Sequence, residues 1–77
     1  MMYAPLTVII LDILRRKRSG VARDSELLKE LRKLYGKEVT LKDLNRALME
    51  LELRKIIYVE PVKKNLRLIH VIDRTYL

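Results

Sequence analysis

The residues of the segment 40–54 include side chains that could contact the edges of nucleic-acid bases. Lys42, Arg46 and Met49 are three or four residues apart, so on a helix they share one face, away from the leucines. Asn45 lies on the flank of that face. Lys and Arg can pair with guanine edges or phosphates, Asn can read adenine, and Met can touch the thymine methyl group. The pattern predicts a helix face that binds nucleic acid.

An ordinary solvated helix face is the alternative interpretation of the same segment. Glu50 and Arg54 are four residues apart, a spacing that gives an ion pair on any soluble helix. Glu50 and Glu52 also weaken the nucleic-acid interpretation, because phosphates repel carboxylates.

A second group of cations lies in residues 63–67. Lys63 and Lys64 precede Asn65, and Arg67 follows two residues later. Asn is common in turns, but a turn does not require cations. We therefore expect Lys63, Lys64 and Arg67 to bind phosphates, with plain polar turn residues as the alternative.

The sequence shows no arrangement of residues suited to catalysis or to a bound metal. It has two glycines and no cysteine, and its one histidine, His70, alternates with Ile69 and Val71. Two glycines cannot build a nucleotide-binding loop, and a lone histidine without cysteine makes a metal site improbable. No nucleophile stands with a base. We expect neither an enzyme nor a cofactor.

The net charge suits a polyanionic partner. Seventeen Lys and Arg against ten Asp and Glu give a formal net charge of +7. Residues 1–36 hold eight cations and four acids, and residues 37–77 hold nine and six, so the excess is spread along the chain. Nucleic acid and anionic membrane surfaces both attract such a charge. The basic run of residues 15–18 favours a charged helix end over a DNA contact.

A chain of 77 residues supports one domain, residues 1–77, with a modest core. Gln, Trp and Phe are absent while Lys, Arg, Glu, Ile and Leu are abundant, a bias typical of thermophilic proteins. The apolar stretch of residues 6–14 is too short to span a bilayer and contains Asp12. We expect a cytoplasmic protein with no membrane association.

Apolar periodicity predicts three helices, over about residues 5–18, 24–35 and 40–54. Pro5 suits a first helical position, and the run TVIIL could form a strand, although its length and Asp12 favour helix. The side chains expected in the core are Leu6, Ile9, Ile10, Ile13, Leu14, Leu27, Leu28, Leu31, Leu34, Tyr35, Leu41, Leu44, Ala47, Leu48 and Leu51.

Capping residues support the second and third helices. Asp24 or Ser25 can cap the second, which should end at Gly36 in a left-handed conformation. Thr40 should cap the third helix with Asp43 as its capping-box partner. Residues 56–72 then read as a β-hairpin in which Pro61 requires an edge position. The expected fold class is α+β, mainly helical: a three-helix bundle with a C-terminal β-hairpin.

This order of elements resembles the winged helix-turn-helix family, in its small archaeal or archaeal-virus form. The resemblance covers nearly the whole chain and rests on TLKDLNRALMEL of residues 40–51 and on its direct passage into IIYV of residues 56–59. In that family the third helix is the recognition helix and the hairpin is the wing. Many members have a short strand between the first two helices, for which residues 20–22 are the candidate. The sequence departs at Lys55, where many members carry Gly.

The resemblance implies a small transcription regulator that binds double-stranded DNA, with the third helix in the major groove and the wing on the backbone. The missing linker between helix and hairpin fits this use, since it holds the two at a fixed separation. The alternative is a winged-helix protein–protein interaction module within a larger assembly, because Met49 and Leu53 make the outward face partly apolar. RNA binding is a third possibility that charge does not separate from DNA binding.

An apolar strip on the first helix suggests self-association. Val8 and Leu11 should point outward there, near Tyr3, and a small core does not need them. Scattered exposed aliphatic side chains are common on proteins. A dimer would nevertheless add buried area and read two half-sites. We expect Tyr3, Val8 and Leu11 to form a homodimer interface.

Overall fold

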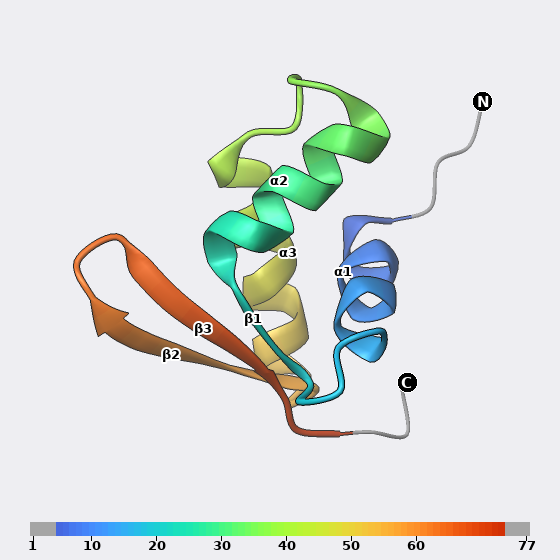
Figure 1. Cartoon of the computed structure of the whole chain (residues 1–77). Helices are drawn as coiled ribbons and strands as arrows, with labels where there is room; N and C mark the ends of the chain where they lie inside the picture. The colour runs from blue at the N-terminus through green and yellow to red at the C-terminus, as the bar shows by residue number, and fades with distance from the viewer. Residues whose placement is uncertain (1–4, 74–77) are drawn as a thin grey trace.

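Residues 5–73 are described by the computed structural model, and they form three α-helices and one three-stranded antiparallel sheet (Figure 1). The elements are α1 (Leu6–Arg15), β1 (Val21–Arg23), α2 (Asp24–Tyr35), α3 (Leu41–Leu53), β2 (Ile57–Lys63) and β3 (Leu66–Val71). The helices pack together, and β2 and β3 extend away from them as a hairpin (Figure 1). The α+β fold class with a C-terminal hairpin is confirmed.

One apolar core joins the helices to the sheet. Its buried members are Ile10, Ile13, Leu14, Ala22, Leu27, Leu31, Val39, Leu44, Ala47, Leu48, Leu51, Ile56, Ile57 and Ile69. Two leucines expected in the core lie outside it, since Leu34 is 59% exposed and Leu41 is 51% exposed. Leu34 is the second-last residue of α2 and Leu41 the first of α3.

The first helix is shorter than predicted. It ends at Arg15 instead of near Arg18, and residues 16–20 form turns. The Gly20 N–H donates to the Lys17 carbonyl at 3.1 Å, and Gly20 has a φ of 69°, which favours glycine. The cationic run therefore lies largely in a turn and not on a helix.

The start of α2 also differs from the prediction. The N-cap position is held by Arg23, and neither Asp24 nor Ser25 caps the helix. The Asp24 carboxylate instead accepts the Ser25 N–H at 2.8 Å. Because β1 runs directly into α2, its last residue already has the extended backbone of an N-cap.

The α2–α3 connection matches its predicted signals. Gly36 ends α2 with a φ of 88°, and its N–H donates to the Arg32 carbonyl at 2.8 Å. The Arg32 side chain then bonds the Val39 carbonyl at 2.9 Å, which fixes the turn from the helix side. At the start of α3, the Thr40 hydroxyl accepts the Asp43 N–H at 3.1 Å and the Asp43 carboxylate accepts the Thr40 N–H at 2.9 Å. The capping box is confirmed.

The junction from α3 to β2 is a Schellman motif. The Ile56 N–H donates to the Leu51 carbonyl and the Lys55 N–H to the Glu52 carbonyl, both at 3.0 Å. Lys55 has a φ of 62°, the left-handed conformation for which many winged helices use glycine. The next residue, Ile56, is 2% exposed, so the chain enters the core immediately after the helix. Its carbonyl also accepts the Ile72 N–H at 2.8 Å, just beyond β3.

The sheet has the strand order β1-β3-β2. The short strand expected between the first two helices is present as β1, which pairs with β3 through Ala22 and Ile69. Pro61 lies in β2, an outer strand, as its missing N–H requires, and the pairing with β3 shifts register between Pro61 and Lys63. Asn65, with a φ of 66°, forms the tip of the hairpin.

Replacing Lys55 with glycine tests the strain at the junction. We expect Lys55→Gly to raise the free energy of unfolding by about 1 kcal/mol, because glycine adopts positive φ without a clash at Cβ. Urea denaturation measures the change. Lys55→Ala removes the same charge but keeps Cβ, and it should give no gain. An equal gain for alanine would assign the effect to the charge.

Candidate nucleic-acid interface

The outward face of α3 carries the side chains predicted for it. Lys42, Arg46 and Met49 are exposed, Met49 by 62%. Within residues 5–73, neither Lys42 nor Arg46 forms an ion pair, so both charges are available to a partner. Leu53, 77% exposed, continues the face towards the end of the helix.

Glu50 and Glu52, the acidic residues that argue against nucleic-acid binding, both have bonding partners in the fold. Glu50 lies 3.8 Å from Arg54, the i,i+4 pair expected of a soluble helix. The Glu52 carboxylate accepts the Val59 N–H at 3.1 Å, which ties the end of α3 to the start of β2. Both carboxylates are therefore engaged beside the cationic face.

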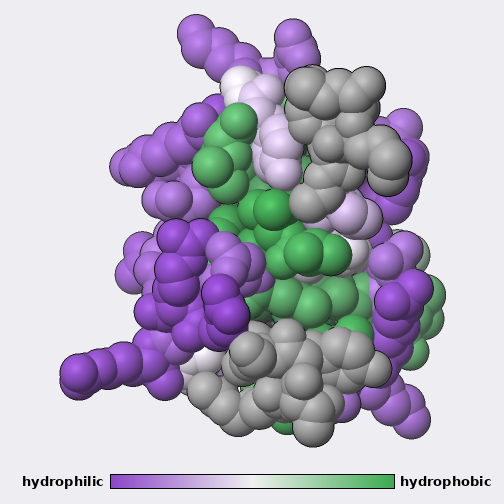
Figure 2. Space-filling view, turned by 90° about the vertical axis from the view of Figure 1, so that its right-hand side faces the viewer, coloured by the Kyte–Doolittle hydropathy of each residue, from purple (hydrophilic) through white to green (hydrophobic). Residues whose placement is uncertain are grey.

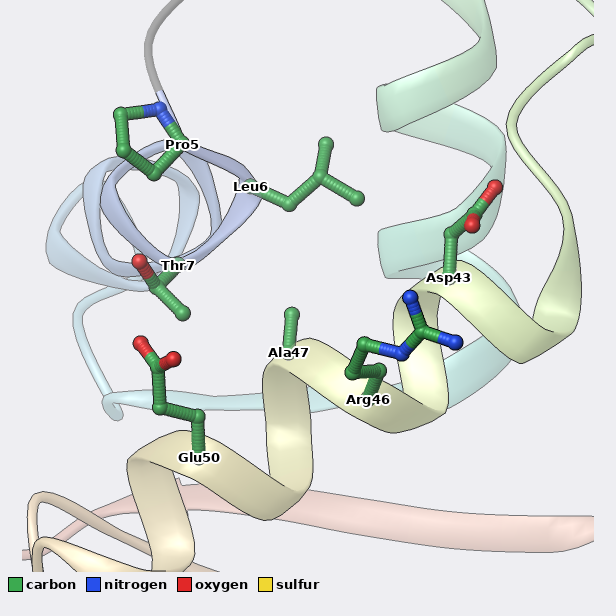
Figure 3. A pocket seen from close by; sticks show the side chains of 7 residues that line it. All are labelled: Pro5, Leu6, Thr7, Asp43, Arg46, Ala47 and Glu50. Carbon is green, nitrogen blue, oxygen red and sulfur yellow. The ribbon is translucent and has the colours of Figure 1, made fainter.

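Arg46 borders a shallow cavity between α1 and α3. The cavity measures about 250 Å³ and is lined by Pro5, Leu6, Thr7, Asp43, Arg46, Ala47 and Glu50 (Figure 3). The hydrogen bonds from Thr40 hold the pKa of Asp43 below its usual value, and the charges of Arg46 and Lys42 lower it further. Asp43 therefore stays ionised at the start of α3, where the helix dipole favours a negative charge.

The wing tip presents two lysines to solvent. Lys63 and Lys64 are exposed, and in the described part of the chain neither forms an ion pair. Both lie beside Asn65, whose left-handed backbone makes the turn. The tip thus carries two charges on a narrow hairpin that extends from the helices (Figure 1).

Arg67 does not extend into solvent at the tip as expected. Its Nε atom donates to an Asp24 carboxylate oxygen at 3.0 Å, and its Nη2 atom donates to the Asn45 amide oxygen at 2.7 Å. The guanidinium therefore joins β3 to the first residue of α2 and to α3. Arg67 lies on the face of β3 that also carries the buried Ile69, and this alternation is the sequence signal for its inward position.

A groove lies between the first half of α2, the first half of α3 and the tip of the wing. It has a volume of about 440 Å³ and is lined by Asp24, Ser25, Leu28, Leu41, Asn45, Asn65, Leu66 and Arg67. Asn45 therefore faces this groove on the wing side of α3, apart from the cavity that Arg46 borders. The predicted residues fall on two sides of one helix.

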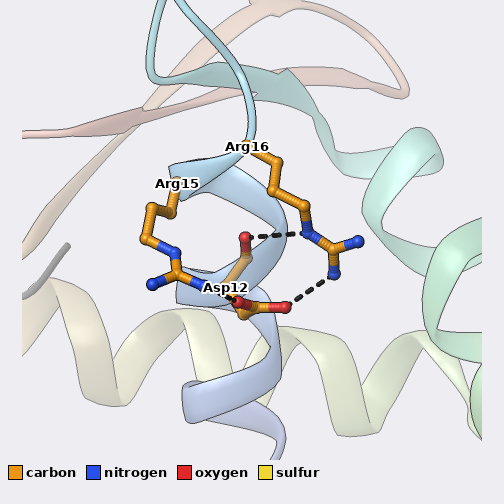
Figure 4. A network of polar contacts seen from close by, with 3 residues as sticks. All are labelled: Asp12, Arg15 and Arg16. Atoms are coloured by element: carbon orange, nitrogen blue, oxygen red, sulfur yellow. Dashed lines mark hydrogen bonds and ion pairs between the residues drawn. The ribbon is translucent and has the colours of Figure 1, made fainter.

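The basic run at residues 15–18 is mostly neutralised. Arg15 and Arg16 both bond the Asp12 carboxylate, at 2.7 Å and 2.6 Å (Figure 4). The Arg16 hydrogen bond is the main cause of the lowered pKa of Asp12. Lys17 pairs with Glu26 of α2. Arg15 and Arg16 therefore stabilise the end of α1, and Lys17 ties the turn that follows to α2.

The three residues predicted for a dimer interface, Tyr3, Val8 and Leu11, differ in exposure and in whether the structure describes them. Val8 is 52% exposed on α1. Leu11 is half-buried and packs against the core, so its outward position is only partly right. Tyr3 lies outside the described residues. Seen from the α1 side, the surface has a central apolar area flanked by charged side chains (Figure 2).

His70 lies in the sheet and pairs with a carboxylate. Its Nε2 atom is 2.8 Å from Glu60, and its ring lies 5.7 Å from that of Tyr58, its cross-strand neighbour. Among the described residues, no group of three His, Asp or Glu side chains is placed to hold a metal ion. Within the same residues, no helix has the length and apolar character needed to span a membrane.

Two solved structures share this arrangement. One is described as the complex structure of hsRosR-S1; it has a TM-score of 0.78 and 18% sequence identity, and the match covers 96% of this chain and 63% of that chain. The complex structure of hsRosR-S4 gives the same TM-score and identity, over 96% of this chain and 62% of that chain. The chain therefore spans less than two thirds of hsRosR. At this identity the likeness shows the fold, which is a winged helix.

Sequence comparisons identify no relative of this chain. No protein-family model matches the chain, and no curated protein sequence matches it.

Removing Arg67 should destabilise the protein. Removing a solvent-exposed side chain that only binds phosphate would not lower the free energy of unfolding. Arg67→Met leaves the Asp24 carboxylate, whose side chain is 11% exposed, without its cation. We expect a loss of roughly 2–3 kcal/mol in the free energy of unfolding, measured by urea denaturation. The double variant Asp24→Asn, Arg67→Met should lose less, because no charge is stranded. Equal losses in the two variants would contradict this role.

Proposed function

We propose that the chain is a DNA-binding protein, a small transcription regulator that places α3 in the major groove of double-stranded DNA and the wing tip on the phosphate backbone. The observation that carries this proposal is that two exposed cationic surfaces, the outward face of α3 and the wing tip, belong to one rigid unit. The Schellman junction and the bond from Glu52 to Val59 hold them together. The winged-helix fold supports this proposal. In helix-turn-helix proteins the second helix of the motif, which corresponds to α3, lies in the major groove.

The residue types suit different tasks within this proposal. Arg46 and Lys42 reach base edges or phosphates from α3, and Met49 supplies an apolar contact for a thymine methyl group. Lys63 and Lys64 bind phosphates only. Their side chains carry charge but no rigid pair of hydrogen-bond donors with which to read a base edge. Asn45 faces the groove towards the wing. The net charge of +7 favours association with any duplex before a site is found.

One observation favours a second candidate, a protein–protein interaction module. Met49 and Leu53 are 62% and 77% exposed on the face of α3 that would meet the partner. Exposed apolar side chains on a helix face, Met among them, are typical of protein interfaces. DNA binding explains Met49 through a thymine methyl contact, but it leaves Leu53 in solvent. Binding to DNA separates the two candidates directly.

Two sets of substitutions should weaken DNA binding in different ways. Arg46→Ala removes a base contact, so we expect it to cost roughly 1–3 kcal/mol on a selected site and much less on random duplex. Lys63→Ala with Lys64→Ala removes two phosphate contacts, so every sequence should bind more weakly. The slope of log affinity against log salt should fall by about 0.9 per contact. Titrations of selected and random duplexes at several salt concentrations measure both effects.

Both sets lie on solvated surface, and circular dichroism should show unchanged folding. Lys29→Ala with Lys37→Ala, in α2 and in the turn after it, is a matched control, because it removes two exposed lysines that form no ion pair among the described residues. If both test variants bind with wild-type affinity and salt slope, the assigned surface is wrong. If no duplex is retained at about 100 mM salt, the interaction module is favoured.

The apolar area on α1 fits a second copy of the chain. A domain of this size buries a limited fraction of its surface, and Val8 remains 52% exposed in the first turn of α1. We propose a homodimer through α1, with Val8, Leu11 and Tyr3 at the interface. Two recognition helices would then read two half-sites.

Charge at Val8 should separate the subunits. Val8→Glu places a carboxylate in an apolar interface, so we expect a dimer mass for wild type and a monomer mass for the variant by light scattering at tens of micromolar. Leu53→Glu, at an exposed apolar site on α3, should leave the dimer intact. A monomer mass for the wild-type chain would exclude the dimer.

A further inference from the structure

The amide of Asn45 has an orientation set by its neighbour. Arg67 donates to the Asn45 Oδ1 atom at 2.7 Å. A guanidinium group carries donors only, so a rotated amide would place its own N–H groups against another donor. The amide oxygen therefore faces Arg67, and the two Nδ2 hydrogens are turned away from it. Asn45 presents donors to an incoming ligand.

The anchor of this arrangement is the Asp24 carboxylate. One oxygen accepts the Ser25 N–H at 2.8 Å and the other accepts the Arg67 Nε donor at 3.0 Å. Its side chain is 11% exposed and that of Arg67 is 30% exposed. The carboxylate thus holds the guanidinium, and the guanidinium holds the amide.

Leu41 lies next to this amide. Leu41 and Asn45 are four residues apart on α3, so they share one side of the helix, and both line the groove of about 440 Å³ beside the wing. Leu41 is 51% exposed and does not belong to the core. Asn45 therefore offers a hydrogen-bond donor, and Leu41 offers two methyl groups beside it.

We propose that Asn45 and Leu41 read a thymine in the major groove and that Arg67 is the residue that positions the amide; this inference rests on the proposed DNA binding. Thymine is the base whose major-groove edge presents an acceptor, O4, beside a methyl group. Cytosine presents a donor in place of O4 and is rejected by the Nδ2 donors. The bidentate adenine contact expected from the sequence needs the amide oxygen as well, and that oxygen serves Arg67.

Replacing thymine with deoxyuridine tests the methyl contact, because it removes that group alone. A site selected from random duplex is remade with uracil at each thymine in turn, and affinities are measured. For one thymine we expect uracil to weaken wild-type binding about fourfold, the value of one buried methyl group. Leu41→Ala should bind the two duplexes equally. Met49→Ala, which shortens another exposed apolar side chain of α3, should keep the difference at that thymine.

Replacing the same thymine with 5-methylcytosine tests the donor, because the methyl group is kept while the O4 acceptor is replaced by an amino donor. We expect wild-type affinity to fall on the order of tenfold, as for loss of a base contact. Asn45→Ala should show little preference. The double variant Asp24→Asn, Arg67→Met frees the amide and leaves no carboxylate without its cation. Its preference for thymine should fall towards that of Asn45→Ala. If that variant does not fold, Arg67→Lys keeps a cation beside Asp24 but lacks the second donor arm, and it should show the same fall.

The outcomes separate the inference from the function on which it rests. A selected motif that responds to Arg46→Ala but has no thymine sensitive to Leu41→Ala and Asn45→Ala overturns the inference and leaves DNA binding intact. An unchanged thymine preference in both Arg67 variants overturns the positioning role. Failure to retain any duplex overturns the proposed function and the inference together.

Discussion

The backbone at Lys55 and Ile56 is the constraint on which the arrangement of this protein depends. The left-handed residue reverses the chain at the end of α3, and the two crossed hydrogen bonds of the Schellman motif place Ile56 directly in the core. The same Ile56 carbonyl accepts an N–H from the end of β3. One buried residue therefore fixes the helix end, the start of β2 and the exit of β3. The angle between α3 and the wing follows from it.

Local pairing of acids neutralises part of the positive charge that is spread along the chain. Asp12, Glu26 and Glu50 each pair with a cation near them in the fold, and Asp24 takes Arg67. Exposed ion pairs of this kind add little stability. Their effect is on the surface potential, since they cancel charge on α1 and at the end of α3. Lys42, Arg46, Lys63 and Lys64, on α3 and on the wing, form no ion pair, and among the described residues the same holds for Arg18, Arg23, Lys29, Lys37 and Lys55.

The sequence predicted those parts of the structure that arise from local interactions. The capping box at Thr40, the positive φ of Gly36 and the edge position of Pro61 each depend on residues within a few positions of one another. Leu34 and Leu41 fit the helical period but lie at helix ends, and periodicity does not reveal where a neighbouring element stops. Arg67 contacts Asp24 across 43 positions. The exposed cations of the candidate site were predicted, whereas the side chain that restrains Asn45 depends on tertiary packing.

The edges of the sheet determine how this protein can associate without aggregating. β1 has three residues, too few to template a further strand. β2 carries a proline that lacks an N–H, and next to it a register shift disturbs the ladder. A second chain therefore finds no regular row of donors and acceptors along either side of the sheet. Strand addition is therefore disfavoured as a route to fibrils.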